Sequence, residues 1–142
     1  MRSEDRKIYE IIEKEMKLSE KEIDEIFEKN KYLKVIIPLD LVQLMIFFEK
    51  YGITREEMGQ IAKKNPYFLT ESFERIRYIE KFLNLVGITD IRWMAVNHPT
   101  SMSINPIKIK DFINKNRAEN KSDEEIKKMI MDDYEKYFEN KQ

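Results

Sequence analysis

The side chains most able to do chemistry in this sequence are cations in the segment 92–117. This segment contains five basic residues and a single acid, Asp111. The five are Arg92, Lys108, Lys110, Lys115 and Arg117. Grouped lysines and arginines bind phosphate oxygens, so the segment is a candidate nucleic-acid contact. Because residues seven apart share a helix face, Lys108 and Lys115 can act together while Lys110 points elsewhere. A solvated helix face remains the alternative interpretation.

Three further sites have both a functional and a structural interpretation. Lys63 and Lys64 are candidate partner contacts, but they also end a short helix, where cations favour the helix dipole. Trp93, beside Arg92, is either an exposed anchor for a partner or a packing residue between repeats. His98 has no second histidine or cysteine for zinc and no nucleophile motif beside it, which favours a structural role at a helix end.

Composition argues against catalytic, metal and redox chemistry. The chain of 142 residues has no cysteine, one histidine and three glycines, which leaves little room for thiolate sites, histidine clusters or phosphate-binding loops. Acid pairs are so common that pairing carries no catalytic signal. We therefore predict a non-enzyme without a cofactor or a metal. The 26 basic and 27 acidic residues nearly balance, which favours a protein partner over a nucleic-acid or membrane surface.

No segment of the sequence has the pattern of a targeting or membrane-spanning element. The first residues mix acids and bases, and no apolar stretch follows them. The longest apolar run, 41–48, is interrupted by Gln43 and is too short to cross a bilayer. We expect a cytoplasmic protein that does not associate with membranes.

The strongest pattern is an internal repeat. Three similar tripeptides, 17–19, 52–54 and 87–89, recur at spacings of 35 residues, and Lys121-Ser122 begins a fourth copy. Ser19, Thr54, Thr89 and Ser122 are each expected to cap a helix. Three of these caps are followed by glutamate at the third position and predict a full capping box: Ser19 with Glu22, Thr54 with Glu57, and Ser122 with Glu125.

Each cap is followed by the same succession of elements. A short amphipathic helix ends at an Asn or His before an aromatic or proline-containing stop, and a longer apolar helix follows. The longer helices are expected at about 38–50, at about 71–85 and from Pro106 onward. Gly52 and Gly87 suit left-handed helix ends. The run 32–37 is expected to be extended or a short 3₁₀ turn.

These patterns predict an all-α fold of about eight helices. We expect one domain, 1–142, built as a right- or left-handed solenoid of about three helical-hairpin repeats. Helices at 1–16 and 121–142 would cap the repeats 17–51, 52–86 and 87–120. The C-terminal aromatic residues Tyr134, Tyr137 and Phe138 would either cap the stack or mediate a dimer. The acidic segment 121–142, with a net charge of −2, could also fold over the basic segment.

The repeat resembles that of the mitochondrial transcription termination factor (mTERF) family. The best match runs from Tyr51 to Gly87 and rests on the residues Gly52-Ile53-Thr54, Ile61, Pro66, Phe68-Leu69, Ile76 and Phe82-Leu83. A looser copy before it has Lys31 where the family has proline. The resemblance implies stacked pairs of helices with a short 3₁₀ turn, and nucleic-acid binding through a basic concave surface.

The function expected from the sequence is therefore non-enzymatic binding. The first hypothesis is a small regulator or inhibitor that binds a protein partner, of the kind that phages and mobile elements encode. The alternative is an mTERF-like protein that binds DNA or RNA through a basic concave face. The candidate contacts for either partner are Arg92, Trp93, Lys108, Lys110, Lys115, Arg117, Lys63 and Lys64. The sequence leaves the oligomeric state and the identity of the partner open.

Overall fold

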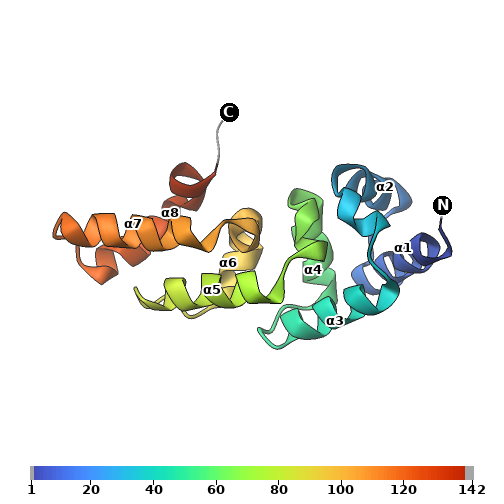
Figure 1. The fold of residues 1–142 in the computed structure, drawn as a ribbon, viewed down its shortest axis with the longest axis horizontal. Helices are drawn as coiled ribbons and strands as arrows, with labels where there is room; N and C mark the ends of the chain where they lie inside the picture. Colours follow the sequence, from blue (N-terminus) through green and yellow to red (C-terminus); the bar gives the residue numbers. More distant parts are fainter. Residues whose placement is uncertain (1, 140–142) are drawn as a thin grey trace. The chain divides into compact units, whose positions relative to one another are not determined.

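A computed structural model describes residues 2–139, and this part of the chain is helical throughout (Figure 1). Its elements are α1 (Ser3–Met16), α2 (Glu20–Lys29), η1 (Lys31–Lys34), α3 (Pro38–Glu49), α4 (Arg55–Lys64), η2 (Pro66–Thr70), α5 (Phe73–Asn84), α6 (Ile91–Asn97), η3 (Pro99–Ser103), α7 (Pro106–Ala118) and α8 (Asp123–Phe138), where η denotes a 3₁₀ turn. The expected all-α class and the expected eight α-helices are confirmed, and residues 2–139 contain no strand.

The helix starts follow the expected capping pattern with one exception. At α2, the Glu22 amide donates to the Ser19 hydroxyl at 3.2 Å, and the Ser19 amide donates to the Glu22 carboxylate at 2.9 Å. The same reciprocal box forms at α4 and α8. The prediction of Thr89 as the cap of α6 is wrong, because Asp90 takes that position and accepts from the Trp93 amide at 2.9 Å. A carboxylate there satisfies a free amide and also suits the positive end of the helix.

Left-handed residues recur between one helix and the next. Gly52 and Gly87 have φ angles of 84° and 88°, as expected for left-handed helix ends. Lys17 and Asn120 adopt the same conformation, with φ angles of 55° and 65°. These four are the only positive-φ residues in the described range, and they are spaced by 35, 35 and 33 residues. The backbone therefore reverses in the same way at each predicted repeat start.

A 3₁₀ turn follows each of the three short helices. The run after Asn30 forms η1, which agrees with the expectation of an extended or 3₁₀ connection. The turns η2 and η3 each begin at a proline, after Asn65 and His98 respectively. Asn30, Asn65 and His98 are all buried despite being polar. Such residues require hydrogen-bond partners, so the same buried position in each stop is a candidate for a structural link.

The chain folds into two compact units, residues 1–71 and 72–142. In unit 1, α1 packs against α3 and α4, and α4 packs against η2. Gly59 on α4 permits the approach to α1, since a Cβ there would lie 2.7 Å from the Met16 carbonyl oxygen. The rings of Phe48 and Phe68 stack with their centroids 4.4 Å apart. The bounds expected for a single domain and its repeats stay a prediction.

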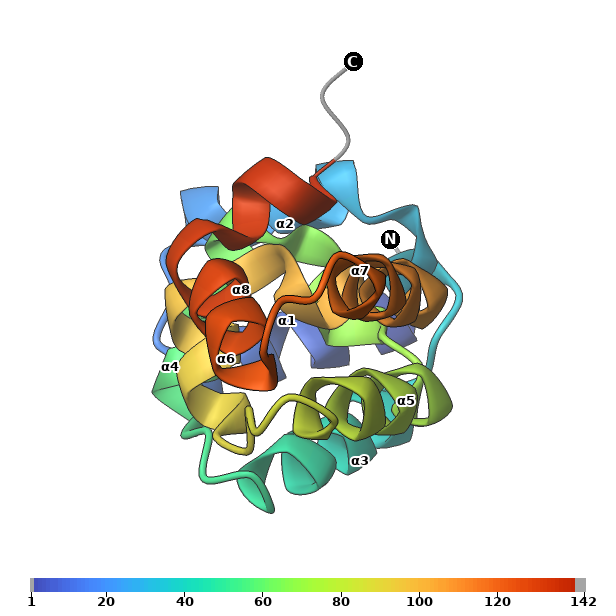
Figure 2. The ribbon, with the colours of Figure 1, turned by 90° about the vertical axis from the view of Figure 1, so that its left-hand side faces the viewer.

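Unit 2 is built around the packing of α5 against α7, which Figure 2 shows nearly end-on. The C-terminal helix α8 also packs against α7, through aromatic side chains. Phe112 packs against Tyr137 and Phe138 at centroid distances of 4.8 and 5.1 Å. Tyr134 and Phe138 are buried and Tyr137 is half-buried, so these aromatics contribute to the core of this unit.

Candidate binding surfaces

The cations of α7 do not gather on one side of the helix. At about 100° of rotation per residue, Lys108 and Lys115 fall on one side, while Lys110 and Arg117 fall roughly opposite. The Lys110 ammonium lies 5.8 Å from the centroid of the Phe82 ring on α5. Arg92 is exposed on a different helix, α6. The structure therefore brings Lys108 and Lys115 together and separates them from the other two α7 cations.

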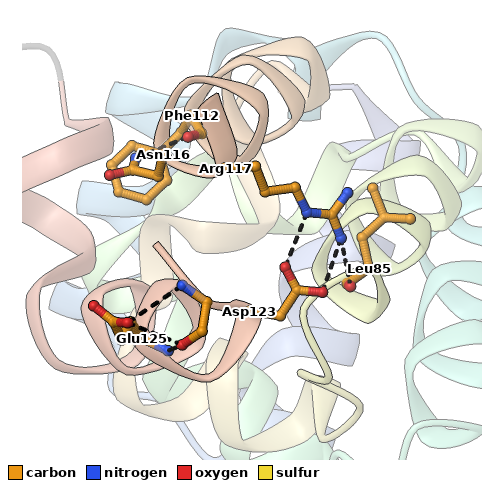
Figure 3. Close-up of polar contacts among 7 residues, drawn as sticks. Leu85, Phe112, Asn116, Arg117, Asp123 and Glu125 are labelled. Carbon is orange, nitrogen blue, oxygen red and sulfur yellow. Dashed lines mark hydrogen bonds and ion pairs between the residues drawn. The ribbon is translucent and has the colours of Figure 1, made fainter. Parts of the chain in front are cut away.

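Arg117 is engaged within its own unit (Figure 3). Its guanidinium donates to the two carboxylate oxygens of Asp123 at 2.9 and 3.0 Å and to the Leu85 carbonyl oxygen at 3.1 Å. The hydrogen bond from Arg117 lowers the pKa of Asp123, and the same bond raises the pKa of Arg117. The arginine thus links the ends of α5 and α7 to the start of α8. An acid of the C-terminal segment covers this one cation.

Lys63 and Lys64 end α4, as expected, and both side chains are exposed. The Lys63 ammonium nevertheless pairs with Glu22 on α2 at 2.8 Å. Hydrogen bonds from Lys63 and then from Ser19 lower the pKa of Glu22 to about 2. Lys63 therefore fastens two short helices of unit 1 to each other, in addition to its favourable place at a helix C-terminus.

Trp93 and His98 belong to a polar cluster within unit 2. His98 is 8% exposed, with Nδ1 at 2.6 Å from a Glu135 carboxylate oxygen and Nε2 at 2.6 Å from the Met131 carbonyl oxygen. The half-buried Trp93 ring meets the imidazole edge-on at 5.7 Å. Burial would raise the pKa of Glu135, but the hydrogen bond with His98 lowers it overall. The His98 side chain therefore joins the end of α6 to α8, near a kink in α8 at Asp133.

Asn30 makes the corresponding link in unit 1. Its amide nitrogen donates to the Pro66 carbonyl oxygen and to the Thr70 hydroxyl, both at 2.9 Å. Its amide oxygen accepts from the Tyr32 amide at 3.1 Å. Both ends of the side-chain amide are therefore satisfied in a fully buried position. Sequence reasoning missed this role, although an asparagine at the same place before two of the stops was a visible signal.

The three most exposed large apolar side chains of residues 2–139, those of Val35, Tyr32 and Leu39, lie on or just after η1, where sequence reasoning proposed no contact. Tyr32 is 63% exposed, Val35 71%, Ile37 48% and Leu39 56%. These four residues are called the η1 surface below. With three residues per turn, Tyr32 and Val35 share one side of the 3₁₀ turn, and Leu33 faces the core. The signal in the sequence was a strand-like run, 32–37, outside any amphipathic helix.

The η1 surface has basic neighbours on η1, and one acid, Asp40, directly follows it and accepts from the Ile37 amide at 2.9 Å. Residues 29–39 contain three lysines and no acid. Lys31 and Lys34 share the side of the turn next to that of Tyr32 and Val35. All three lysines in this stretch are exposed. An apolar surface bordered by cations matches a partner that presents apolar and acidic groups together.

The remaining chemistry of the described chain is limited. Within residues 2–139, no three His, Asp or Glu side chains are grouped so that they could hold a metal ion. None of the helices described is both long and apolar enough to cross a membrane. Comparison with known proteins finds no matching family model, no matching curated protein and no matching solved structure.

Proposed function

We propose that this protein is a non-enzymatic helical-repeat module that regulates or inhibits a protein partner by binding it through the η1 surface. The observation that carries the proposal is the exposure of Tyr32, Val35, Ile37 and Leu39 within eight residues of chain. Grouped exposed apolar side chains are typical of protein contacts, whereas single ones are ordinary. Aromatic side chains at the centre of such a surface supply much of the binding energy.

A solenoid architecture is part of this proposal. It is supported by the left-handed residues at 17, 52, 87 and 120 and by a 3₁₀ turn after each short helix. Repetition of one local geometry along a chain is the usual basis of stacked helix pairs. The likeness of this plan to the mTERF repeat also stays a proposal, and it concerns architecture first.

The binding test compares three forms of the full chain in affinity capture from cell extract. Y32S/V35S removes the two most exposed apolar side chains of the η1 surface, and the control Y78S/I107S removes an exposed tyrosine and an exposed aliphatic side chain from unit 2. We expect the wild type and Y78S/I107S to retain one common protein, and Y32S/V35S to bind that protein about 10-fold or more weakly. Equal retention of that protein by all three forms contradicts the assignment of the η1 surface.

A nucleic-acid-binding function is the second candidate, and one observation favours it. Lys108 and Lys115 are exposed on the same side of α7, with the spacing of two helical turns. Two cations on one face can contact successive phosphates of a nucleic acid. Lys110 and Arg117 lie elsewhere on the helix, so the basic surface is smaller than the sequence suggested.

Fluorescence anisotropy with labelled duplex DNA, single-stranded DNA and RNA tests this second function. Binding at about 50 mM salt that weakens steeply by about 200 mM would report phosphate contacts. K108Q/K115Q should then reduce the slope of log affinity against log salt concentration by the amount expected for about two phosphate contacts. K7Q/K14Q on α1 is the matched control, because it removes two exposed lysines with the same spacing. Absence of binding at the lower salt concentration eliminates this candidate.

A further inference from the structure

Unit 1 contains a cavity of about 640 Å³ between α1, α2 and η1 (Figure 1 shows these elements). Its volume lies in the range of sites that bind small molecules, roughly 300–1,000 Å³. Two aromatic rings, Tyr9 and Phe27, form apolar wall, with their centroids 6.4 Å apart. Both side chains are half-buried. The cavity therefore has an aromatic lining that is partly shielded from water.

Two of the residues that line the cavity, Arg2 and Asp5, form an ion pair. The Arg2 guanidinium lies 2.6 Å from the Asp5 carboxylate and also donates to the Ile36 carbonyl oxygen at 2.9 Å. Asp5 is buried, and its hydrogen bond from Arg2 lowers its pKa. These two charges neutralise each other and hold the start of α1 against the residues after η1. They shape the cavity without leaving a free charge.

The other charged side chains at the cavity are two acids on α2 and two lysines on η1. Asp24 and Glu28 are four residues apart on α2 and therefore lie on one face of that helix. Lys31 and Lys34 are three residues apart on η1 and share one side of the turn. Within residues 2–139, neither pair forms an ion pair with other side chains. Two carboxylates and two ammonium groups thus border the same aromatic cavity.

The Tyr9 hydroxyl adds an unsatisfied polar group to this wall. Its oxygen is buried and has no hydrogen-bond partner among the described residues. Burial and then the nearby acids Glu20, Asp24 and Glu13 raise its pKa, so it stays a neutral hydroxyl that can donate or accept. A buried polar atom without a partner is uncommon in proteins.

We propose that this cavity binds a small zwitterionic ligand with an apolar body, namely an amino acid or a short peptide. The ligand ammonium pairs with Asp24 and Glu28. The ligand carboxylate pairs with Lys31 and Lys34. The apolar body lies against Phe27 and the Tyr9 ring, where a cation is also favoured by the ring faces. This site shares Lys31 and Lys34 with the border of the η1 surface, but it uses none of the four apolar side chains of that surface.

The test is isothermal titration calorimetry of the full chain with five probes that share one aromatic body. These are phenylalanine, the dipeptide Phe-Ala, phenylalaninamide, N-acetylphenylalanine and N-acetylphenylalaninamide. We expect at least one zwitterion to bind about 10-fold more tightly than each of the three capped probes, since a charge pair is lost in each of these. The ratio of affinities for phenylalanine and Phe-Ala distinguishes an amino-acid site from a peptide site.

Charge variants assign each end of the ligand. D24N/E28Q should lower the affinity for the zwitterion about 10-fold and leave the affinity for N-acetylphenylalanine unchanged. K31Q/K34Q should lower the affinity for the zwitterion by the same factor and leave the affinity for phenylalaninamide unchanged. D111N/E124Q removes two exposed acids from unit 2 and should change nothing. Equal affinity for the uncharged probe, or no heat from any probe up to about 10 mM, overturns the proposal. Circular dichroism confirms that each variant is folded.

Discussion

Asn30 in unit 1 and His98 in unit 2 hold the same place in the two halves of the chain. Each is the buried C-cap of a short helix, directly before a 3₁₀ turn. Each side chain binds residues more than 30 positions further along the chain. Asn30 binds η2, and His98 binds α8. The requirement at this position is therefore a polar side chain that links one helix pair to the next.

The two links differ in chemistry. Asn30 is neutral, fully enclosed and satisfied by a carbonyl oxygen, a hydroxyl and an amide. His98 is ionisable and faces two acceptors, one of which, Glu135, is partly exposed to water. Removal of the first link leaves buried groups without partners, whereas removal of the second leaves a carboxylate that water can still reach. We therefore expect the loss of the Asn30 link to lower the stability of the protein more than the loss of the His98 link.

The largest effect is expected for Asn30→Ala. This change removes the side-chain hydrogen bonds to the Pro66 carbonyl oxygen and the Thr70 hydroxyl and takes the side-chain acceptor from the Tyr32 amide, which should lower the free energy of unfolding by about 3 kcal/mol. Urea denaturation followed by circular dichroism measures it. Thr70→Val is the partial control, because it removes one acceptor and should cost about 1 kcal/mol. A loss below about 1 kcal/mol for Asn30→Ala would show that the link does not carry the packing.

His98→Ala should destabilise the protein less, by about 2 kcal/mol. The change removes both imidazole hydrogen bonds and the ring contacts to Trp93 and Tyr134. His98→Gln, which keeps a donor, should fall between the wild type and the alanine variant in the same denaturation experiment. If His98→Ala proves as costly as Asn30→Ala, the comparison between the two links is reversed.

The left-handed residues between helices extend the comparison with a smaller effect. Gly87→Ala has room for its methyl group, because the nearest atom to that Cβ is the Lys127 Cδ at 3.9 Å. Its loss of about 1 kcal/mol should therefore come from backbone strain alone. Lys17 occupies the equivalent place at φ 55°, and Lys17→Gly should stabilise by about 0.5 kcal/mol. Thermal unfolding of both variants tests this, and a change of the same sign in both would refute the strain argument.

The smallest effect concerns acid stability and the capping boxes of the two units. The pKa of Glu22 lies near 2 in the folded chain, below the ordinary value of about 4.3 for an unfolded glutamate. Its ionised form therefore contributes stability above about pH 4.3, and that contribution is lost as the pH falls toward 2. Glu22→Gln should make the fall in unfolding free energy across this range shallower than in the wild type.

Glu125→Gln is the matched control for this experiment. Glu125 forms the same box with Ser122 at the start of α8, but it has no lysine contact within the described residues. Its variant removes the glutamate of a capping box without removing a hydrogen bond from a lysine. An equal flattening by Glu22→Gln and Glu125→Gln would show that the box, rather than the bond from Lys63, lowers the pKa of Glu22.

Local features were predictable because they depend on neighbours in sequence. Ser19 and Ser122 cap their helices through residues three positions away, and Gly52 and Gly87 adopt the conformation that glycine permits most easily. The single error among the caps, Thr89 instead of Asp90, is a displacement of one residue between two side chains that both cap well. The helix class and the number of helices follow from such local signals.

The candidate sites were less predictable, because their geometry depends on distant partners. Arg117 was a candidate partner contact in the sequence, but its guanidinium is bound by Asp123 and by the Leu85 carbonyl oxygen. Helical periodicity indicated correctly that Lys110 lies apart from Lys108 and Lys115. The exposure of Tyr32 and Val35 could not be read from their apolar character, which usually indicates burial.

The sequence alone determined most of the positions at which helices begin and end, because capping, periodicity and glycine conformation act over four residues or fewer. The tertiary structure decided which polar side chains are linked, which cations stay in solvent and which apolar residues are left uncovered. The bonds of His98 to residues 33 and 37 positions away, and the cavity between α1, α2 and η1, are examples. These features arise from packing between helices, and the side chains that meet there are set by the folded backbone rather than by sequence separation.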